Sequence, residues 1–437
     1  MDLVRETTQL FESASREFAV RLWDETVLPP PRPSDLRATL VLATPRAVHA
    51  LLPPITELGL AEAFLDGDLE IEGDTIGLLA SAMRWEGPRP TGTTIRAALR
   101  IAASRALGRL GERAGIAARL RGRTHSVDRD RQAVQHHYDV SDDFYRLFLD
   151  EEMVYSCAYF TPGARSLAEA QKAKLELVCR KLSLEKGERF LDVGCGWGAL
   201  VAHAARRHGA TAIGITLSEN QLTEARRRLA SGAPGATVLA EDYRKLAGVE
   251  RFHKIASVGM MEHVGLRRLP EYFAALHRLL HPGGLLLNHA IADVSADLPA
   301  LRFTSQRGGG FIDRYIFPDG ELLPIGTVLG AAERAGFEVR DVESLREHYA
   351  ETCAAWVERL EQRFDEAERL VGRRRARAYR LYLASSSAQF QAGRISVFQA
   401  LLAKPDEKGR VHAVPRSRGE WYEARPEDAR KGSERTG

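Results

Sequence analysis

The sequence predicts an α/β fold in which a parallel sheet is covered by helices on both faces. From residue 187 onward, short apolar segments alternate with amphipathic ones. The expected strands are Phe190–Val193, Ala212–Ile215, Val238–Leu239, Ile255–Val258 and Leu285–His289, and the clearest helices between them are Glu219–Leu229 and Pro270–Leu280. Strands that alternate with helices are typical of a doubly wound sheet. A glycine-rich segment directly after the first strand supports this assignment, because such folds bind cofactors at that turn.

The composition is that of an ordinary globular protein long enough for two domains. The chain has 437 residues, of which 44% are hydrophobic and 28% are charged, and 62 basic residues against 59 acidic ones leave a net charge of +3. This balance gives no general argument for nucleic-acid binding. No stretch is apolar for long enough to span a membrane, and charged residues interrupt the apolar N-terminus. We therefore expect a cytoplasmic protein without a signal peptide.

Changes in composition along the chain predict four segments. They are a small mixed α+β domain over residues 1–86, a basic linker helix over 87–130, the main α/β domain over 131–403, and a disordered polar tail over 404–437. The first segment is expected to contain a helix over Leu10–Trp23 and a strand over Thr39–Thr44. In the second, Ile95–Arg123 has a helical pattern with eight arginines and one acidic residue. The third is expected to be largely helical from Tyr349 to Ala403.

The four cysteines do not suggest a metal site. Cys157, Cys179, Cys195 and Cys353 form no CxxC pair and have no zinc-finger spacing. This spacing argues against a disulfide framework and against a structural metal. We therefore expect no bound metal.

The loop Gly194-Cys195-Gly196-Trp197-Gly198 is the strongest local signal. Glycines allow a tight turn and close approach of the backbone to a ligand beside a helix N-terminus. An NAD site would usually have Asp or Glu at the end of the second strand, where this chain has Gly214-Ile215-Thr216-Leu217-Ser218. The loop therefore predicts an S-adenosylmethionine (SAM) site, with Asp242 placed to accept from the adenine amino group. A purely structural turn is the alternative.

Two ionisable residues follow strands at the edge where this fold binds ligands. Glu262 comes shortly after the fourth strand, and His289 ends the fifth. Ligands of open α/β sheets bind beyond the carboxyl ends of the strands. A single strand-end histidine is more often structural, and a single glutamate is more often solvated. Because both share an edge with the cofactor loop, a functional role is favoured.

A series of short motifs runs in order through about residues 130 to 403. They are His137–Tyr145, Met153–Phe160, Leu191–Gly198, Thr216–Gln221, Asp242–Arg244, Met261–Gly265, Asn288–Ile291, Tyr315–Pro318 and His348–Thr352. Together they resemble the cyclopropane fatty acid synthase family, which includes the mycolic acid cyclopropane synthases and related fatty acid methyltransferases. The resemblance implies a Rossmann-like class I SAM methyltransferase sheet with helical insertions. Leu58–Phe64 also resembles the small N-terminal lipid-handling domain of longer members.

The resemblance implies transfer of a methyl group from SAM to the cis double bond of an unsaturated acyl chain on a membrane phospholipid. A carbocation forms, and loss of a proton to a bound bicarbonate closes a cyclopropane ring. The residues implied to hold bicarbonate are Glu262, His289 and Tyr349 through their side chains, and Cys157 and Ile291 through their backbones. The residues implied to bind SAM are Tyr155, Ser156, Gly194, Gly196, Thr216, Gln221, Asp242 and Tyr243.

The expected partners follow from this substrate. The arginines between Arg96 and Arg123 either form a solvated linker or bind anionic phospholipid headgroups. The second interpretation places the protein peripherally on the inner face of the cell membrane. Family members with the extra N-terminal domain resemble dimers, so a homodimer is expected.

Three other interpretations stay open at this stage. The same cation could lose a proton from the acyl chain and give a 10-methylene fatty acid. A methyltransferase for a small metabolite or a nucleic acid is more remote, because the chain has no Asn-Pro-Pro-Tyr or Asp-Pro-Pro-Tyr motif and no Pro-Cys nucleophile. The third is a lipid-binding protein that has lost its activity.

Overall fold

The chain forms two compact units, each built from several segments of the sequence. The computed structural model describes residues 3–12, 16–31, 34–52, 55–84, 92–102, 116–138, 140–230, 232–246, 248, 250–294, 310–411 and 414–422. The N-terminal unit comprises residues 1–149, 293–320 and 346–396. The seven-stranded unit comprises residues 150–292, 321–345 and 397–437. Each unit therefore gathers pieces from distant parts of the chain. The division into four consecutive segments is of another kind and stays a prediction.

The seven-stranded unit is built on one sheet with the strand order β10-β11-β9-β8-β5-β6-β7. Its strands are β5 (Arg189–Val193), β6 (Thr211–Thr216), β7 (Ala236–Ala240), β8 (Phe252–Val258), β9 (Leu280–Asp293), β10 (Glu338–Ser344) and β11 (Ile395–Ala403). β5 pairs in parallel with both β6 and β8, β6 pairs in parallel with β7, and β8 pairs in parallel with β9. β10 is antiparallel to β11. The five strands predicted from the sequence are all present.

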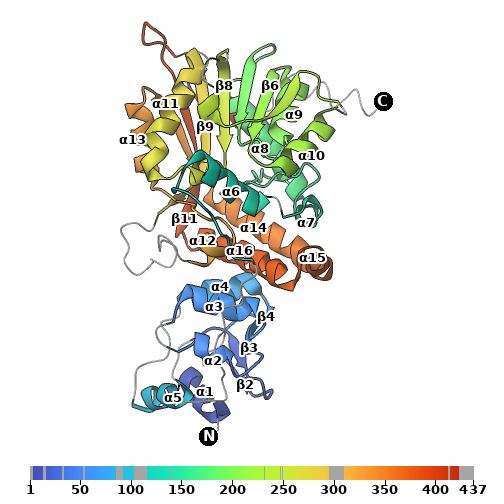
Figure 1. The fold of residues 1–437 in the computed structure, drawn as a ribbon, viewed down its shortest axis with the longest axis vertical. Coiled ribbons are helices and arrows are strands. Elements are labelled where there is room, and N and C mark those ends of the chain that lie inside the picture. The colour runs from blue at the N-terminus through green and yellow to red at the C-terminus, as the bar shows by residue number, and fades with distance from the viewer. Residues whose placement is uncertain are drawn as a thin grey trace. The chain divides into compact units, whose positions relative to one another are not determined.

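Helices cover both faces of this sheet (Figure 1). They are α8 (Leu167–Lys181), α9 (Ala199–His208), α10 (Glu219–Ala230), α11 (Leu269–Leu279), α13 (Ile325–Arg334) and the short α17 (Gly419–Tyr422). One core lies between the sheet and α8, α9 and α10, and a second lies under α11 and α13. β9 contributes to both, since Leu285 and Leu287 pack into the first core and Leu286 into the second. This alternation is the period of two that a strand imposes.

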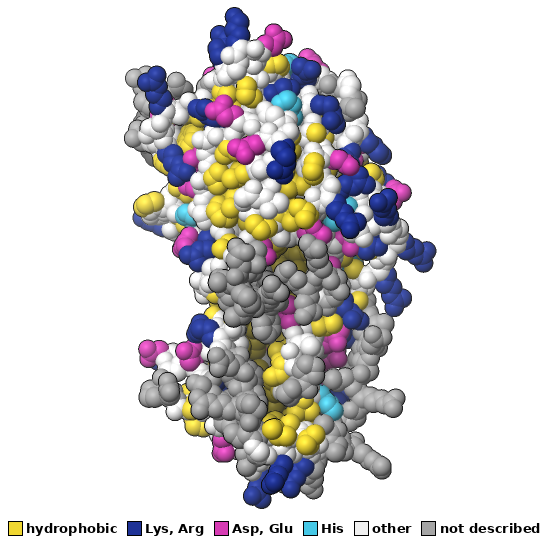
Figure 2. All heavy atoms as spheres, turned by 90° about the vertical axis from the view of Figure 1, so that its left-hand side faces the viewer, with side chains coloured by type: hydrophobic (Ala, Val, Ile, Leu, Met, Phe, Trp, Pro, Cys, Tyr) yellow, Lys and Arg dark blue, Asp and Glu magenta, His cyan; other side chains and the backbone are white. Residues whose placement is uncertain are grey.

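The seven-stranded unit also exposes hydrophobic side chains. Leu266 is 41% exposed and Leu322 is 36% exposed. Figure 2 shows hydrophobic side chains (yellow) gathered on the side of this unit where α11 and α13 lie. Exposed apolar groups that gather in one area are typical of surfaces that contact lipid or protein.

The N-terminal unit combines a small sheet with helices. The sheet has the order β2-β1-β3-β4, formed by β1 (Ala19–Arg21), β2 (Val27–Leu28), β3 (Ala38–Leu42) and β4 (Leu69–Gly73). The helices are α1 (Leu3–Glu12), α2 (Ala47–Ala50), α3 (Glu57–Leu65), α4 (Thr75–Ala82), α5 (Gly92–Ala102), α6 (Val127–Tyr138), α7 (Asp142–Arg146), α12 (Phe311–Tyr315), α14 (Arg346–Gln362), α15 (Phe364–Val371) and α16 (Arg373–Gln391). The predicted α/β fold with a small α+β N-terminal part is therefore confirmed.

A buried arginine joins the small sheet to the long helix α16. The Arg377 guanidinium donates to the carbonyls of Phe64 and Leu69, forms an ion pair with Glu70, and lies 4.2 Å from the centre of the Phe64 ring. A buried charge is stable only when its donors are satisfied in this way. The segment that resembles a lipid-handling domain is thus packed against α16 within one unit.

Four local predictions differ from the structure. The helix predicted over Leu10–Trp23 ends at Glu12 and is followed by β1, and the basic linker is helical over Gly92–Ala102 but not over 116–123. The last part of the predicted helical region is the strand β11 (Ile395–Ala403). The tail expected to be disordered is ordered over 404–411 and 414–422, because Trp421 is buried in the core beside α8. Residues 103–115 and 423–437 lie outside the described residues. None of the described helices is both long enough and apolar enough to cross a membrane.

Candidate active site

The order of the strands indicates where a ligand would bind, at the carboxyl ends of β5 and β8. From β5 the chain adds β6 on one side of the sheet and later adds β8 on the other. At such a switch point the connections leave the sheet in opposite directions, which opens a ligand site. The loop after β5 and the segment after β8 therefore border one site, within a single unit.

The glycine loop after β5 has the backbone conformation of a ligand cradle. Gly194 and Gly196 have φ angles of +79° and +53°, which other residues rarely adopt. The amides of Gly194 and Cys195 donate to the carbonyl of Ile215 in β6, which fixes the loop. No atom lies within 4 Å of the place where a Cβ of Gly196 would stand. The loop thus leaves room for a cofactor against its backbone.

The turn after β6 is held by side-chain hydrogen bonds. The Thr216 hydroxyl donates to Oε1 of Gln221 at 2.8 Å and accepts from the amide of Ser218 at 3.2 Å. The amide of Gln221 donates to the Ser218 hydroxyl. Thr216 and Gln221 are both buried, so this turn has a fixed shape beside the glycine loop. Their role toward SAM stays a prediction.

Asp242 and Tyr243 follow β7 at the same edge of the sheet. The Asp242 carboxylate accepts from the Arg244 amide and from its guanidinium, at 2.9 Å for both the amide and Nε and 2.6 Å for Nη2. Tyr243 packs edge-on against Tyr272 with 5.5 Å between ring centres. The carboxylate is therefore oriented by Arg244, and its oxygens have remaining lone pairs for a further donor.

A buried lysine supports the segment that precedes Cys157. Lys174 on α8 donates to the Ser156 hydroxyl at 2.8 Å, and Gln171 donates to the backbone carbonyl of Ser156 at 2.8 Å. Burial lowers the pKa of Lys174 to about 8, while nearby Cys157 and Asp192 act in the opposite direction. Burial raises the pKa of Asp192, in β5, to about 7. These groups form a buried polar cluster next to the glycine loop.

The Glu262 side chain is partly buried and is held by the neighbouring strand. Its Oε1 accepts from the backbone amide of Ile291 at 2.8 Å. Its Oε2 is also buried and has no hydrogen-bond partner among the described residues. Burial raises the pKa of Glu262 to about 7. A carboxyl group with a pKa near neutral pH can be either protonated or ionised. Its open oxygen can therefore donate a hydrogen bond to a ligand or accept one from it.

His289 lies in β9 and pairs with Val258 of β8. Its Nδ1 faces the amide nitrogen of Gln399, in β11, at 3.2 Å, and its Nε2 is buried without a hydrogen-bond partner among the described residues. With the amide nitrogen donating, Nδ1 accepts and the ring proton is on Nε2. Burial lowers the pKa of His289 to about 3, with smaller effects from Lys174 and Lys181. The ring is therefore neutral and has one open donor.

The remaining predicted bicarbonate residues have different positions. Ile291 lies two residues after His289 on the same face of β9, and its amide is bonded to Glu262. Cys157 is fully buried, and its thiol donates to the carbonyls of Ala158 and Leu345. Tyr349 belongs to the N-terminal unit, on α14, where its ring stacks on Phe390 with 4.6 Å between centres. The ligand roles of all three stay predictions.

Sequence reasoning missed four residues that support the candidate site. They are Gln171, Lys174, Asp192 and Gln399. Asp192 was part of the glycine-loop motif. The signal that could have identified it is an acidic residue within an otherwise apolar strand. Gln399 was missed because its segment was expected to be helical. The contact of Gln399 with His289 joins residues 110 positions apart, which no local pattern reveals.

Comparisons with known proteins agree with this geometry. The profile of the family described as mycolic acid cyclopropane synthetase matches residues 125–400. A probable fatty acid methyltransferase from Pseudomonas putida is 38% identical over 418 residues, which cover 92% of this chain and 95% of that protein. This similarity includes the N-terminal part of the chain as well as the sheet.

Two solved structures match a shorter part of the chain. A cyclopropane synthase from Mycobacterium tuberculosis is 35% identical with a TM-score of 0.59, and the match covers 63% of this chain and 98% of that chain. A mycolic acid cyclopropane synthase in complex with SAH and CTAB is 37% identical with a TM-score of 0.59, with the same coverage of each chain. Both solved proteins are thus matched over nearly their whole length.

Proposed function

The chain belongs to the mycolic acid cyclopropane synthetase family of SAM-dependent methyltransferases, and we propose that it acts on the cis double bond of an unsaturated acyl chain of a membrane phospholipid. The proposed product is a cyclopropane fatty acid. The observation that carries the proposal is that Glu262 and His289 each have a buried, open polar atom at the edge of the sheet that holds the glycine loop.

The glycine loop fits the cofactor. When bound, SAM supplies an electrophilic methyl group on a sulfonium centre. Gly194 and Gly196 would allow SAM to approach the backbone of the loop closely. Thr216, at the end of β6, and Gln221, at the start of α10, would border it. Tyr155, Ser156, Asp242 and Tyr243 are proposed to complete the site. The CTAB bound to the solved relative is a long-chain ammonium compound, which supports an acyl chain as substrate.

A dry site suits the proposed chemistry. An isolated alkene is a poor nucleophile, so methyl transfer leaves a positive charge on the neighbouring carbon that water would quench. His289 is buried, and the open oxygen Oε2 of Glu262 has no contact with solvent, so water has little access to these two polar atoms. Loss of a proton from the transferred methyl group then closes the ring, and that proton needs an acceptor.

The open atoms of Glu262 and His289 fit a bound bicarbonate, which would act as that acceptor. A buried anion is stable only if donors surround it. Nε2–H of His289 is such a donor, and Glu262 becomes one when its carboxyl is protonated, which its raised pKa of about 7 allows near neutral pH. Tyr349 and the backbones of Cys157 and Ile291 are the further proposed ligands.

A vesicle assay tests the proposal. The protein is incubated with methyl-labelled SAM and vesicles of an unsaturated phosphatidylglycerol, and label is expected in the lipid fraction. Vesicles of the saturated lipid are the matched control and should remain unlabelled. Label on small metabolites or nucleosides but not on lipid would contradict the proposed substrate, and lipid binding without turnover would indicate a protein without activity.

Removal of dissolved carbon dioxide tests the bicarbonate. Turnover is expected to fall when the buffer is stripped of carbon dioxide and to recover when bicarbonate is added. Sodium chloride at the same ionic strength is the control. Full turnover in the stripped buffer would show that another group accepts the proton.

A 10-methylene product is the second candidate. The relative that matches nearly the whole chain is named a fatty acid methyltransferase, whereas the solved relatives that match the sheet are named cyclopropane synthases. Both products arise from the same cation and have the same mass. Proton NMR of the methylated lipid separates them, because cyclopropane methylene protons and vinylidene protons resonate far apart.

We also propose that the basic helix α5 contacts anionic lipid at the cytoplasmic face of the membrane. Ile95 and Leu99 are 50% and 66% exposed, and Arg96 and Arg100 lie beside them on the solvent side. Each basic residue near an anionic surface contributes about 1 kcal/mol. Binding to phosphatidylglycerol vesicles is expected to fall with salt and to fall again in the variant Arg96→Glu/Arg100→Glu. An exposed helical arginine elsewhere, Arg369→Glu, is the control.

Unchanged vesicle binding of the double variant would remove α5 from the proposal without affecting the reaction. The expected homodimer is likewise a proposal. Sedimentation velocity of the full chain tests it, and a single monomeric species at micromolar concentration would contradict it.

A further inference from the structure

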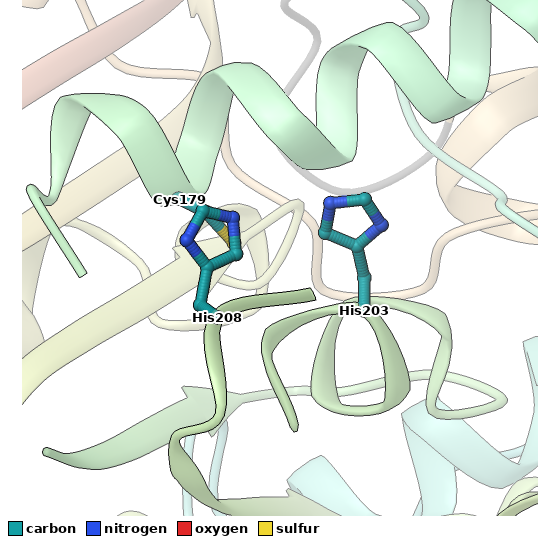
Figure 3. A group of neighbouring side chains, drawn as sticks. All are labelled: Cys179, His203 and His208. Carbon is teal, nitrogen blue, oxygen red and sulfur yellow. The ribbon is translucent and has the colours of Figure 1, made fainter. Parts of the chain in front are cut away.

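Three metal-binding side chains meet between two helices of the seven-stranded unit. Cys179 comes from α8, and His203 and His208 come from α9. One possible ligand atom from each lies within 4.8 Å of the others. Figure 3 shows both imidazole rings rising from the α9 segment toward the helix that carries Cys179. None of these residues belongs to the candidate active site.

A carboxylate on α8 contacts both histidines of this group. Oε2 of Glu176 lies 2.9 Å from Nε2 of His203 and 3.2 Å from Nε2 of His208. Glu176 precedes Cys179 by three residues, so both side chains project from one face of the helix. The set therefore contains one carboxylate, one thiol and two imidazoles.

The distances suit tetrahedral coordination. With zinc–nitrogen and zinc–oxygen bonds of about 2.0–2.1 Å, two such ligands of a tetrahedral ion stand about 3.3 Å apart. The two distances from Glu176 to the histidines lie within a few tenths of an ångström of that value. A thiolate and an imidazole stand about 3.6 Å apart around zinc. Since all three atoms already lie within 4.8 Å, small side-chain rotations close the site.

The ends of the two helices favour a cation at this place. His208 is the last residue of α9, and Cys179 lies in the last turn of α8. The carbonyl end of a helix carries partial negative charge. The same last turns also carry Arg180, Lys181, Arg206 and Arg207, and Nε of Arg180 donates to the other oxygen of Glu176 at 2.8 Å. That contact leaves Oε2 to face the two histidines.

We propose that Glu176, Cys179, His203 and His208 bind a zinc ion that joins α8 to α9. Thiolate, imidazole and carboxylate are the ligands of zinc sites, and four protein ligands are typical of structural sites. On binding, the thiol of Cys179 releases its proton to solvent as the zinc–sulfur bond forms. The zinc stabilises the helix that follows the glycine loop, at the end of that helix remote from the loop. This proposal revises the expectation of no metal that was drawn from cysteine spacing alone.

Without metal, Glu176 simply accepts hydrogen bonds from both histidines, and Cys179 takes no part. The thiol of Cys179 is bonded to the metal in one case and has no role in the other, so a probe of the metal–sulfur bond distinguishes the two cases. Cobalt(II) replaces zinc in such sites and gives a thiolate-to-cobalt charge-transfer band in the near ultraviolet.

The experiment titrates cobalt(II) and then zinc into the full chain after treatment with a chelator. We expect the charge-transfer band to saturate at one equivalent of cobalt, zinc to abolish the band, and zinc to raise the melting temperature. Cys179→Ser should lose the band completely. His203→Gln, which changes a partly exposed side chain, should weaken zinc binding at least about tenfold.

A second histidine pair provides the matched control. His253 and His281 lie in the same unit with 4.7 Å between ring centres, so His281→Gln removes one ring of a close pair outside the site. It should leave the band and the zinc affinity unchanged. The proposal is overturned if no band forms in the unmodified protein, or if the band survives in both Cys179→Ser and His203→Gln.

Discussion

Replacement of Glu262 by glutamine tests the electrostatics of the candidate active site. Glutamine has nearly the same shape and keeps an oxygen that can accept from the amide of Ile291, which is 2.8 Å from the Glu262 carboxyl. It cannot ionise. The variant should therefore fold like the parent protein but respond differently to pH.

The size of this difference follows from the shifted pKa. Burial raises the pKa of Glu262 from its ordinary value of 4.5 to about 7. Between these values the folded state keeps a proton that the unfolded state has lost, so stability falls as pH rises and levels off above about pH 7. From about pH 5 to about pH 9 the parent protein should lose about 2.5 kcal/mol that Glu262→Gln does not lose. All other groups titrate in both proteins, so their contributions to the change in stability cancel in the comparison.

Urea denaturation at both pH values measures this difference. Glu321→Gln is the matched control, because Glu321 also accepts a backbone amide, that of Leu266 at 2.8 Å, but in an exposed hydrogen bond, whereas the bond from Ile291 to Glu262 is partly buried. It should follow the parent protein. Turnover of Glu262→Gln should also fall by about 100-fold or more, with SAM affinity nearly unchanged. If Glu262→Gln and the parent protein lost stability in parallel from low to high pH, the carboxyl would not be buried as described and the argument for its role would fail.

Three further substitutions are expected to have distinct effects. His289→Asn removes the open Nε2 and should lower turnover about 100-fold without changing SAM affinity, measured by calorimetry. Gly194→Ala should cost about 1–2 kcal/mol of stability and weaken SAM binding, because φ is +79° and the new Cβ would lie 3.0 Å from Met260. Lys174→Met removes the nearby charge that lowers the pKa of Asp192, so this pKa should rise further above about 7, and the fall of stability with pH, measured by urea denaturation, should extend to higher pH than in the parent protein.

Each of these substitutions has a contrasting result. Asparagine at 289 can still face Gln399, so a large loss of stability in that variant would point to a structural role. Gly187→Ala is the control for Gly194→Ala, because φ is +84° there and no atom lies within 4 Å of the new Cβ. Equal SAM affinity in the two glycine variants would remove the glycine loop from the cofactor site. A Lys174→Met variant whose stability levels off at the same pH as that of the parent protein would show that Asp192 does not depend on the lysine.

The sequence predicted the strands that alternate with helices because their signal is local. β5, β6, β8 and β9 each contain a short apolar run next to glycine or polar turn residues. A buried parallel strand can be predicted from such a run alone, without knowledge of the strand with which it pairs. The position of Glu262 shortly after β8 follows from the same pattern, whereas His289, expected at the end of its strand, lies within β9, which continues to Asp293. Chain order alone therefore places them at one edge of the sheet.

Local patterns were misleading where burial changes along a segment. Phe18, Val20 and Leu22 are buried in alternation, which is the period of a strand, yet the apolar residues before them continue a helical pattern. β11 is buried on both faces and shows neither period, so it was taken for a helix. Trp421 orders part of a polar tail by inserting one ring into a distant core.

The composition, the alternation of strands and helices, and the glycine loop were determined by the sequence itself, because each depends on residues close together in the chain. Only the tertiary structure brought Gln399 to His289, Lys174 to Ser156, and Cys179 to the histidines of α9. These contacts join separate elements, and their energies depend on burial that exists only after the elements have packed. The raised pKa of Glu262 and the lowered pKa of His289 have the same origin.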